Sequence, residues 1–128
     1  MRRLIVFSVV IISIGIATCN IAGDSSVEII KEKSNGNGTK AVLFMKFGGA
    51  TVNNSLQIAL IGGENKIKNG DSGNIFICDD TTGGVNKSDA NISWKSPDTL
   101  EIIYKRGLRL FKKEQDLKNI RIIYKSVE

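Results

Sequence analysis

Residues 70 to 73 read Gly-Asp-Ser-Gly, the tetrapeptide that surrounds the nucleophilic serine of chymotrypsin-like proteases. A serine nucleophile needs a neighbouring base that accepts its proton at neutral pH. The chain contains no histidine, and its 128 residues are too few for two β-barrels. Lysine is an alternative base, but nothing in the sequence places one beside Ser72. The segment is therefore predicted to be a turn before a buried strand, with Asp71 hydrogen-bonding the turn backbone.

The acidic residues offer a second kind of chemistry. Asp79 and Asp80 supply oxygen ligands of the kind that calcium prefers, but the ordered ligand spacing of a calcium-binding loop is missing. The two carboxylates of a glycosidase stand about 5 to 9.5 Å apart, and the sequence does not place Asp98 and Glu101 in such a pair. The absence of histidine removes most zinc and copper sites, and two cysteines do not replace it. We therefore predict no catalytic residues, no metal and no cofactor.

A set of candidate binding residues remains, which consists of Gly49, Ala50, Thr51, Asp79, Asp80 and Trp94. The glycine-rich segment 48–51 is either a bulge where backbones approach closely or a binding loop. The acidic pair lies in a polar segment, which is either solvated or contacts a ligand. The only tryptophan of the chain either packs against a sheet or offers a sugar an aromatic platform.

The amino terminus indicates export. Arg2 and Arg3 precede an uncharged apolar run over residues 4–17. This run is shorter than the roughly 20 residues of a membrane span, and it fits the apolar part of a secretory signal peptide. It has no polar face, which argues against a first helix of the folded domain. We predict a signal peptide over residues 1–18, a tether over 19–26 and a single β-rich domain over 27–128.

Ile16-Ala17-Thr18-Cys19 resembles a bacterial lipobox, whose cysteine receives lipid. Thr18 departs from the usual small residue at that place, and cleavage after Ala17 or an uncleaved membrane anchor are the alternatives. We predict lipidation of Cys19 and a membrane-anchored lipoprotein of the cell envelope; a secreted or periplasmic protein is the alternative. Two acyl chains anchor a protein stably, because each buried methylene contributes about 0.8 kcal/mol. Cys78 then has no intramolecular partner and is predicted to be buried, the alternative being a disulfide with Cys19.

The net charge of +5 is unevenly distributed along the chain. Basic residues are concentrated in the last quarter, namely Lys105, Arg106, Arg109, Lys112, Lys113, Lys118, Arg121 and Lys125. They form either a surface for an anionic partner, such as lipid headgroups or cell-wall polymer, or a solvated strand face. Export and the few aromatic residues argue against a nucleic-acid partner.

From Val27 onward, short apolar runs alternate with turn residues, which predicts an all-β fold. We expect a curved antiparallel sheet or a small β-sandwich of about seven strands. The nearly continuous apolar run 41–47 indicates a central strand, whereas 54–61 alternates as a strand with one solvated side does. Segment 116–119 is predicted to be a polar connection, and the alternative is one or two helical turns over residues 112–118. The single proline, Pro97, falls in a turn between two strands.

Several short motifs resemble a family of small bacterial exported proteins that carry a domain of unknown function. The motifs are Gly48-Gly49-Ala50-Thr51, Gly73-Asn74-Ile75-Phe76, Trp94, Ser96-Pro97 and Leu100-Glu101-Ile102-Ile103-Tyr104. The similarity spans roughly residues 26 to 105, and many members of the family are predicted lipoproteins. Two places depart from the family pattern: the turn Ser34-Asn35-Gly36-Asn37-Gly38-Thr39-Lys40, and Phe47-Gly48, where many relatives have Asp-Cys. The resemblance implies a fold and a location, and no activity.

The preferred hypothesis is an exported, lipid-anchored, non-catalytic module that binds another protein or a cell-wall component. It rests on the leader with Cys19, the succession of strands and the lack of a catalytic set. The alternative is an exported hydrolase or inhibitor that acts on cell-wall polymers through the acidic segment 79–101. The predicted contacts are the membrane, through the lipid anchor, and a protein or cell-wall partner.

Overall fold

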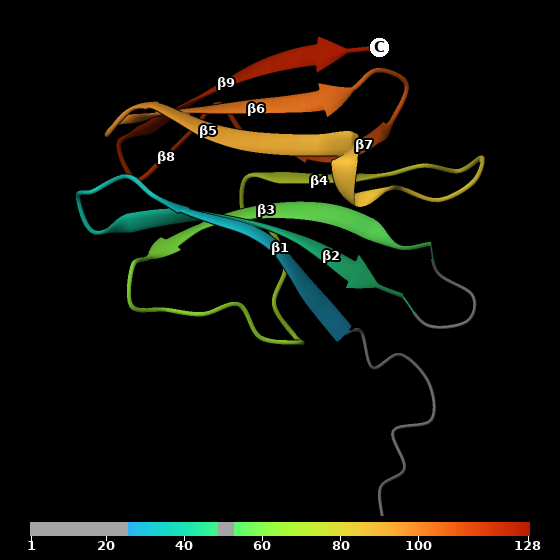
Figure 1. Cartoon of the computed structure of the whole chain (residues 1–128), viewed down its shortest axis with the longest axis horizontal. Helices are drawn as coiled ribbons and strands as arrows, with labels where there is room; N and C mark the ends of the chain where they lie inside the picture. The colour runs from blue at the N-terminus through green and yellow to red at the C-terminus, as the bar shows by residue number, and fades with distance from the viewer. Residues whose placement is uncertain (1–25, 49–52) are drawn as a thin grey trace, which may run out of the picture.

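The computed structural model describes residues 26–48 and 53–128, which form a small sandwich of two β-sheets (Figure 1). Sheet A has the order β1-β2-β3-β4-β7 and contains β1 (Ser26–Ser34), β2 (Thr39–Phe47), β3 (Ser55–Gly62), β4 (Phe76–Asp79) and β7 (Arg109–Lys113). Sheet B has the order β5-β6-β9-β8 and contains β5 (Ala90–Ser96), β6 (Thr99–Lys105), β9 (Ile120–Val127) and β8 (Asp116–Leu117). One 3₁₀ turn, η1 (Lys87–Asp89), precedes β5. The all-β prediction is confirmed.

The turns between strands follow from residues that tolerate unusual backbone angles. Between β1 and β2, Gly36 and Gly38 have φ values of 75° and 84°, which lie in the left-handed region. The side-chain oxygen of Asn35 accepts hydrogen bonds from the backbone N–H of Asn37 and of Thr39, at 2.8 and 3.1 Å. The predicted turn at this place is therefore confirmed.

Segment 112–118 contains the end of β7 and all of β8, and no helical turn. Lys118 and Asn119, with φ values of 52° and 64°, form a two-residue turn between β8 and β9. Two successive positive φ values are the requirement of the tight turns that connect short antiparallel strands. This hairpin was missed from the sequence because Lys118-Asn119 lacks the glycine that usually marks such a turn.

Sheet B contains a parallel pair, which differs from the predicted antiparallel arrangement. β6 and β9 run parallel, from Thr99 opposite Arg121 to Lys105 opposite Val127. The chain leaves sheet B after β6, adds β7 to sheet A beside β4, and returns through β8 to place β9 beside β6. Parallel neighbours require such a crossover, and here one strand of the opposite sheet lies within it.

The core lies between the two sheets. Its largest fully buried side chains include Leu43, Leu56, Ile58, Leu60, Ile75, Phe76, Ile92, Leu100 and Ile102. Cys78 belongs to the same cluster and is fully buried, so its predicted burial is confirmed. Burial raises the pKa of the Cys78 thiol to about 12, because a low-dielectric interior disfavours the thiolate.

β3 differs from the prediction of one solvated side. Gln57 and Ala59, predicted to face water, are only 5% and 1% exposed. Segment 63–75 folds back over the outer face of sheet A, where Ile67 packs against the cluster of Val42, Phe44 and Ala59. Periodicity along β3 could not reveal this covering segment, which makes β3 a strand buried on both faces.

Gly73 anchors that covering segment. Its backbone N–H donates to the side-chain oxygen of Gln57 at 2.7 Å. A Cβ atom at this position would lie 2.8 Å from the carbonyl oxygens of both Ile58 and Phe76. Asn74 completes the attachment by accepting from the N–H of Leu60 and donating to its carbonyl oxygen, both at 2.8 Å. The segment therefore docks by backbone and amide hydrogen bonds that only a glycine at position 73 allows.

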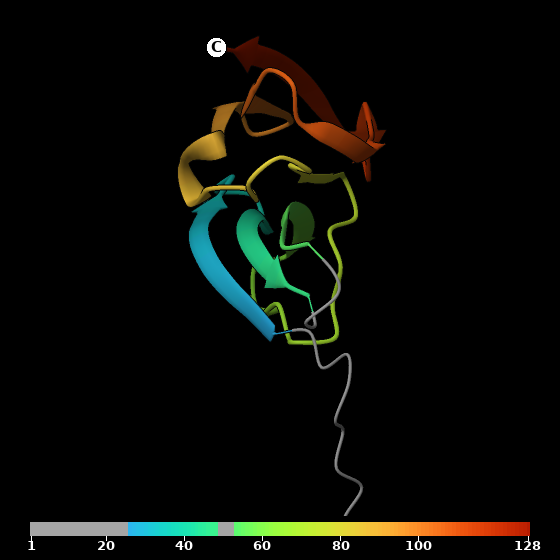
Figure 2. The same cartoon turned by 90° about the vertical axis from the view of Figure 1, so that its right-hand side faces the viewer.

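The sandwich has two lateral sides, which are best seen in Figure 2. On one, here called the β1–β5 side, the edge strands of the two sheets lie next to each other. On the other, here called the β7–β9 side, β7 ends sheet A while β8 and β9 end sheet B. In the described residues, no helix has the length and apolar character needed to cross a membrane.

Candidate functional site

The β7–β9 side leaves part of a strand edge without a partner. β8 pairs with β9 only at Ile120 and Arg121. Beyond a hydrogen bond from the N–H of Ile122 to the carbonyl of Gln115, at 2.9 Å, no strand in the described residues pairs with this edge of β9. An unpaired edge presents backbone donors and acceptors that can bind another chain. We therefore regard this side as the candidate functional site.

Asp79 is the best-placed of the predicted binding residues. It ends β4, its side chain is 6% exposed, and both of its carboxylate oxygens accept from Arg109 on β7. The two distances are 2.9 Å to Nε and 2.6 Å to Nη2, a bidentate arrangement. These hydrogen bonds raise the pKa of Arg109. Asp79 therefore fixes a guanidinium group rather than binding calcium.

The guanidinium of Arg109 lies over the ring of Phe111, 4.8 Å from its centroid. Cys78 pairs with Leu110 and Ile77 with Lys112, so Phe111 is the extra residue of a β-bulge in β7. The bulge turns its side chain outward, and Phe111 is 59% exposed. Asp79, Arg109 and Phe111, here called the bulge cluster, present an aromatic ring and a cation together.

A second aromatic group closes the sandwich between β7 and β9. The rings of Phe76, Tyr104 and Tyr124 lie 5.5 to 6.3 Å apart. The ammonium of Lys113 lies 4.8 Å from the centroid of Tyr124 and 5.7 Å from that of Tyr104, within cation–π range. The hydroxyl of Tyr124 donates to the carbonyl of Glu114 at 2.5 Å. Burial raises the pKa of Tyr124, which keeps this hydroxyl protonated as a donor.

An open groove of about 1050 Å³ runs beside the turn between β8 and β9. Its lining includes the cations Lys113, Lys118 and Arg121, the carboxylate Asp116, and Tyr124. No ion pair holds any of these three cations in the described part of the chain. The groove thus has an excess of positive charge next to the free edge of β9.

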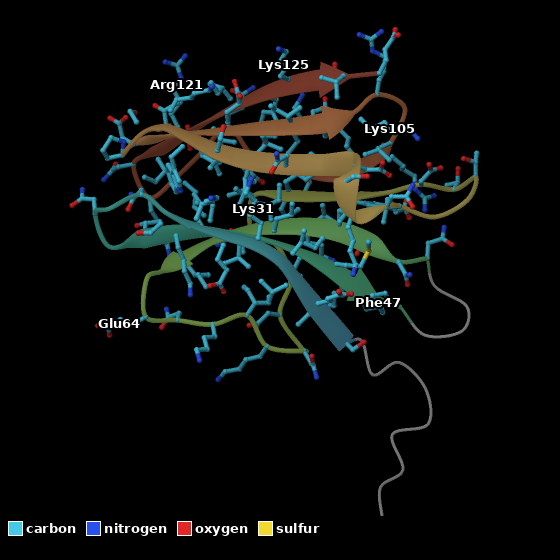
Figure 3. The ribbon with its side chains drawn as sticks, in the orientation of Figure 1. Lys31, Phe47, Glu64, Lys105, Arg121 and Lys125 are labelled. Carbon is cyan, nitrogen blue, oxygen red and sulfur yellow. The ribbon has the colours of Figure 1, made fainter. Side chains whose placement is uncertain are left out.

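Figure 3 shows Arg121 and Lys125 projecting from β9 on the opposite side of the molecule from Glu64. The basic residues that the sequence grouped in its last quarter have different surroundings. Arg109 belongs to the bulge cluster and Arg106 pairs with Glu128 at 3.2 Å, whereas Arg121 and Lys125 remain on the exposed strand.

The structure also places a lysine beside Ser72, which the sequence could not show. Lys46 Nζ on β2 donates to Ser72 Oγ at 3.1 Å and to the carbonyl of Asp71 at 2.8 Å. A lysine that activates a serine must accept the hydroxyl proton, whereas Lys46 is the donor in both of these contacts. The Asp71 carboxylate accepts from the N–H of Lys68 at 2.8 Å, as predicted for a turn. Lys46 therefore stabilises the turn from the adjacent strand.

The remaining predicted residues do not join Asp79. Asp80 is held locally, accepting from the hydroxyl and N–H of Thr82 at 2.6 and 2.9 Å, and these bonds lower the pKa of Asp80. Trp94 lies on β5, across the sandwich, and its indole N–H donates to the carbonyl of Lys33 at 2.8 Å. In the residues that the structure describes, no three His, Cys, Asp or Glu side chains could hold a metal together. Cys19 and the segment Gly49-Ala50-Thr51 lie outside the described residues.

Sequence reasoning missed Arg109, Phe111 and Lys113 as parts of a site. The excess of basic residues was a signal for the cations, but not for which of them would be paired. Phe111 gave no signal, because an apolar residue in a short strand is normally predicted to face the core. Its exposure depends on a bulge defined by pairing with β4, which is distant in sequence.

A comparison with protein-family models finds no match, and no curated protein or solved structure matches the chain either. The resemblance to the family of exported proteins therefore stays a prediction.

Proposed function

We propose that this protein is a lipid-anchored module of the cell envelope that binds a partner and performs no catalysis. The leader over residues 1–18 and the lipobox ending at Cys19 support export and anchoring. A two-sheet sandwich whose strand β9 has unpaired edge groups supports binding. The site residues lie on strands, whose positions are fixed by the sheets.

The bulge cluster is the observation that carries the proposal. Aromatic residues and arginine are enriched among the residues that dominate binding energy at protein interfaces. The Arg109 side chain is 52% exposed, whereas the Asp79 side chain is 6% exposed. A buried carboxylate therefore orients the guanidinium, which remains accessible. A side chain that is already oriented loses less conformational freedom on binding.

The position of the site fits an anchored protein. β1 begins at the lower end of the strands in Figure 1, and β9 lies at the opposite, upper end. A tether that leads into Ser26 attaches to the end of the domain that is remote from β9. β9 then lies at the end of the domain remote from the membrane, where a protein partner can reach it.

The acidic segment gives the hydrolase alternative no support. Asp79 is paired with Arg109, and Glu101 lies 3.3 Å from the ammonium of Lys95. Asp98 accepts from the hydroxyls of Ser96 and Thr99, and these bonds lower its pKa. Each carboxylate thus has its own local partner, so we propose binding alone.

Labelling with radioactive palmitate tests the anchor. The wild type is expected to incorporate label and Cys19→Ala is expected to incorporate none. Equal labelling of both proteins, or none in the wild type, contradicts the anchoring part of the proposal.

Affinity purification from envelope extract tests the binding part. Phe111→Ala is expected to lose a partner that the wild type retains, whereas Ile29→Ala, which truncates a 40% exposed residue on β1, is expected to keep it. Degradation of purified cell-wall polymer by the wild type would instead support the hydrolase alternative.

A further inference from the structure

The free edge of β9 has a definite hydrogen-bonding pattern. The N–H of Arg121 bonds to the carbonyl of Asp98 on the side of β6, and that of Ile122 bonds to Gln115 on the other side. Because backbone groups alternate along a strand, Tyr124 and Ser126 direct their N–H and C=O groups away from β6. In the part of the chain that the structure describes, no strand receives these groups.

Cations accompany this edge. Lys113, Lys118 and Arg121 line the groove that adjoins it, with Asp116 as the opposing carboxylate. Lys125 is exposed on the same strand. A chain that lies along the edge therefore meets backbone donors at Tyr124 and Ser126, the exposed Lys125 between them, and the cations of the groove beside them.

From this combination we propose that β9 accepts an extended, acidic peptide segment of a partner protein as an additional strand of sheet B. Strand addition supplies affinity through main-chain hydrogen bonds and specificity through the neighbouring side chains. The cations select for acidic side chains, since complementary charges promote binding and like charges oppose it.

A second copy of this chain is a poorer occupant. Antiparallel pairing of β9 with β9 of another molecule through the free groups of Tyr124 and Ser126 would place the Lys125 side chains of both copies opposite each other, because position 121 is already paired with β8. Like charges placed opposite each other on neighbouring strands are destabilising. An anionic polymer without amide groups would satisfy the cations but leave the backbone groups of Tyr124 and Ser126 unpaired. The acidic peptide satisfies both.

The inference rests on the proposed binding function, whose partner it defines, but it is tested separately from the anchor. The probe is a fluorescent ten-residue peptide in which Glu alternates with Thr, added to the full chain purified in detergent. We expect saturable binding, seen as a rise in fluorescence anisotropy, and slower hydrogen exchange at the amides of Tyr124 and Ser126. Failure of palmitate labelling leaves this result unchanged, and failure of peptide binding leaves the anchor unchanged.

Two variant pairs separate the backbone and charge contributions. Ser126→Pro removes the outward N–H without removing a bond to β6 and is expected to weaken binding about tenfold, whereas Ser126→Ala is expected to bind as the wild type does. Arg121→Glu is expected to weaken binding about tenfold. Lys66→Glu reverses the charge of an exposed residue in the segment over sheet A. This variant is expected to change peptide binding by less than about twofold.

Several results would overturn the proposal. One is equal binding of a peptide whose alternate amides are N-methylated, since that peptide has the same charge but cannot pair. Another is equal protection of both amides by inorganic polyphosphate, which would indicate an anionic polymer. A third is a dimer whose β9 amides are protected without peptide, which would indicate a second copy.

Discussion

The two lateral sides of the sandwich contain similar residue types but use them differently. On the β1–β5 side, Trp94 and Lys31 bridge the two sheets, the indole N–H bonding to Lys33 and the ammonium donating to Asn91 at 2.8 Å. On the β7–β9 side, Arg109 and Phe111 interact with each other and with sheet A alone. Trp94 and Lys31 thus close the β1–β5 side, whereas Arg109 and Phe111 remain available on the β7–β9 side.

The difference teaches that an open edge need not be a loosely packed edge. Beneath the β7–β9 side, the rings of Phe76 and Tyr124 pack together, and the ammonium of Lys113 lies over the Tyr124 ring. What stays open is the row of backbone groups along β9 and the side chains that surround it. On this side, the packed rings therefore stabilise the fold, while the backbone groups of β9 stay accessible.

The sharpest test of this comparison exchanges an aromatic residue for alanine on each side. Trp94→Ala is expected to lower the free energy of unfolding by about 3 kcal/mol, because the ring packs against the core and its N–H bridges the sheets. Phe111→Ala is expected to cost less than about 0.5 kcal/mol, since its ring is mostly solvated. Urea unfolding of both variants measures the difference, and equal losses would mean that Phe111 is structural.

A smaller effect concerns the asymmetry of the bulge cluster. Arg109→Ala leaves the Asp79 carboxylate buried without its partner and is expected to cost about 2 kcal/mol. Asp79→Ala leaves an arginine that can turn to water, at a cost of about 1 kcal/mol. The free energy of unfolding of the double variant should be close to that of Asp79→Ala. Additive losses in urea unfolding would show that the two residues are not coupled.

Tyr124→Phe removes one hydrogen bond from the seal of the β7–β9 side, at a cost of about 1 kcal/mol. Burial raises the pKa of Tyr124 in the folded state. The tyrosine therefore contributes stability that is fully present at a pH below its pKa in the unfolded chain, which is about 10. This stability is lost as the pH rises through the pKa of Tyr124 in the folded protein. Unfolding free energies at pH 8 and pH 11 should therefore fall more in the wild type than in Tyr124→Phe.

Cys78 adds to the alkaline loss in both proteins, since burial raises its pKa from 9.0 to about 12. The difference between the two proteins therefore isolates the tyrosine. An identical fall in both would contradict the assignment. Tyr104→Phe, which changes a neighbouring ring of the same cluster, is the matched control.

The smallest expected effect lies on the closed side. Lys87 of η1 forms an exposed ion pair with Glu28 of β1, and exposed pairs contribute little. Lys87→Met is expected to cost about 0.5 kcal/mol or less, and 1 M salt should remove the difference from wild type. A loss that persists in high salt would show that packing, rather than charge, joins β1 to η1.

The sequence predicted features that depend on near neighbours. Alternating apolar runs indicated strands, Asn35 and Gly36 indicated a turn, and the apolar surroundings of Cys78 indicated burial. It failed where distant segments meet. Nothing near β3 shows that segment 63–75 will cover Gln57.

The same limit applies to the site. Asp79 was selected as a candidate, but Arg109 lies 30 positions away along the chain, so its role as an orienting group was not visible. Likewise, the free edge of β9 depends on the strand order, which periodicity does not determine. Composition indicated a basic surface, whereas its division into paired and unpaired cations required the fold.

The crossover from β6 through β7 to β9 has a consequence for how the molecule assembles. Sheet B is completed by β9, which follows β7 of sheet A along the chain, so neither sheet consists of one continuous segment. Folding is expected to be a single cooperative event, and a slow one, because its contacts join residues far apart in sequence. A fragment that stops before Ile120 would leave β6 without its parallel neighbour and should not acquire native structure at all.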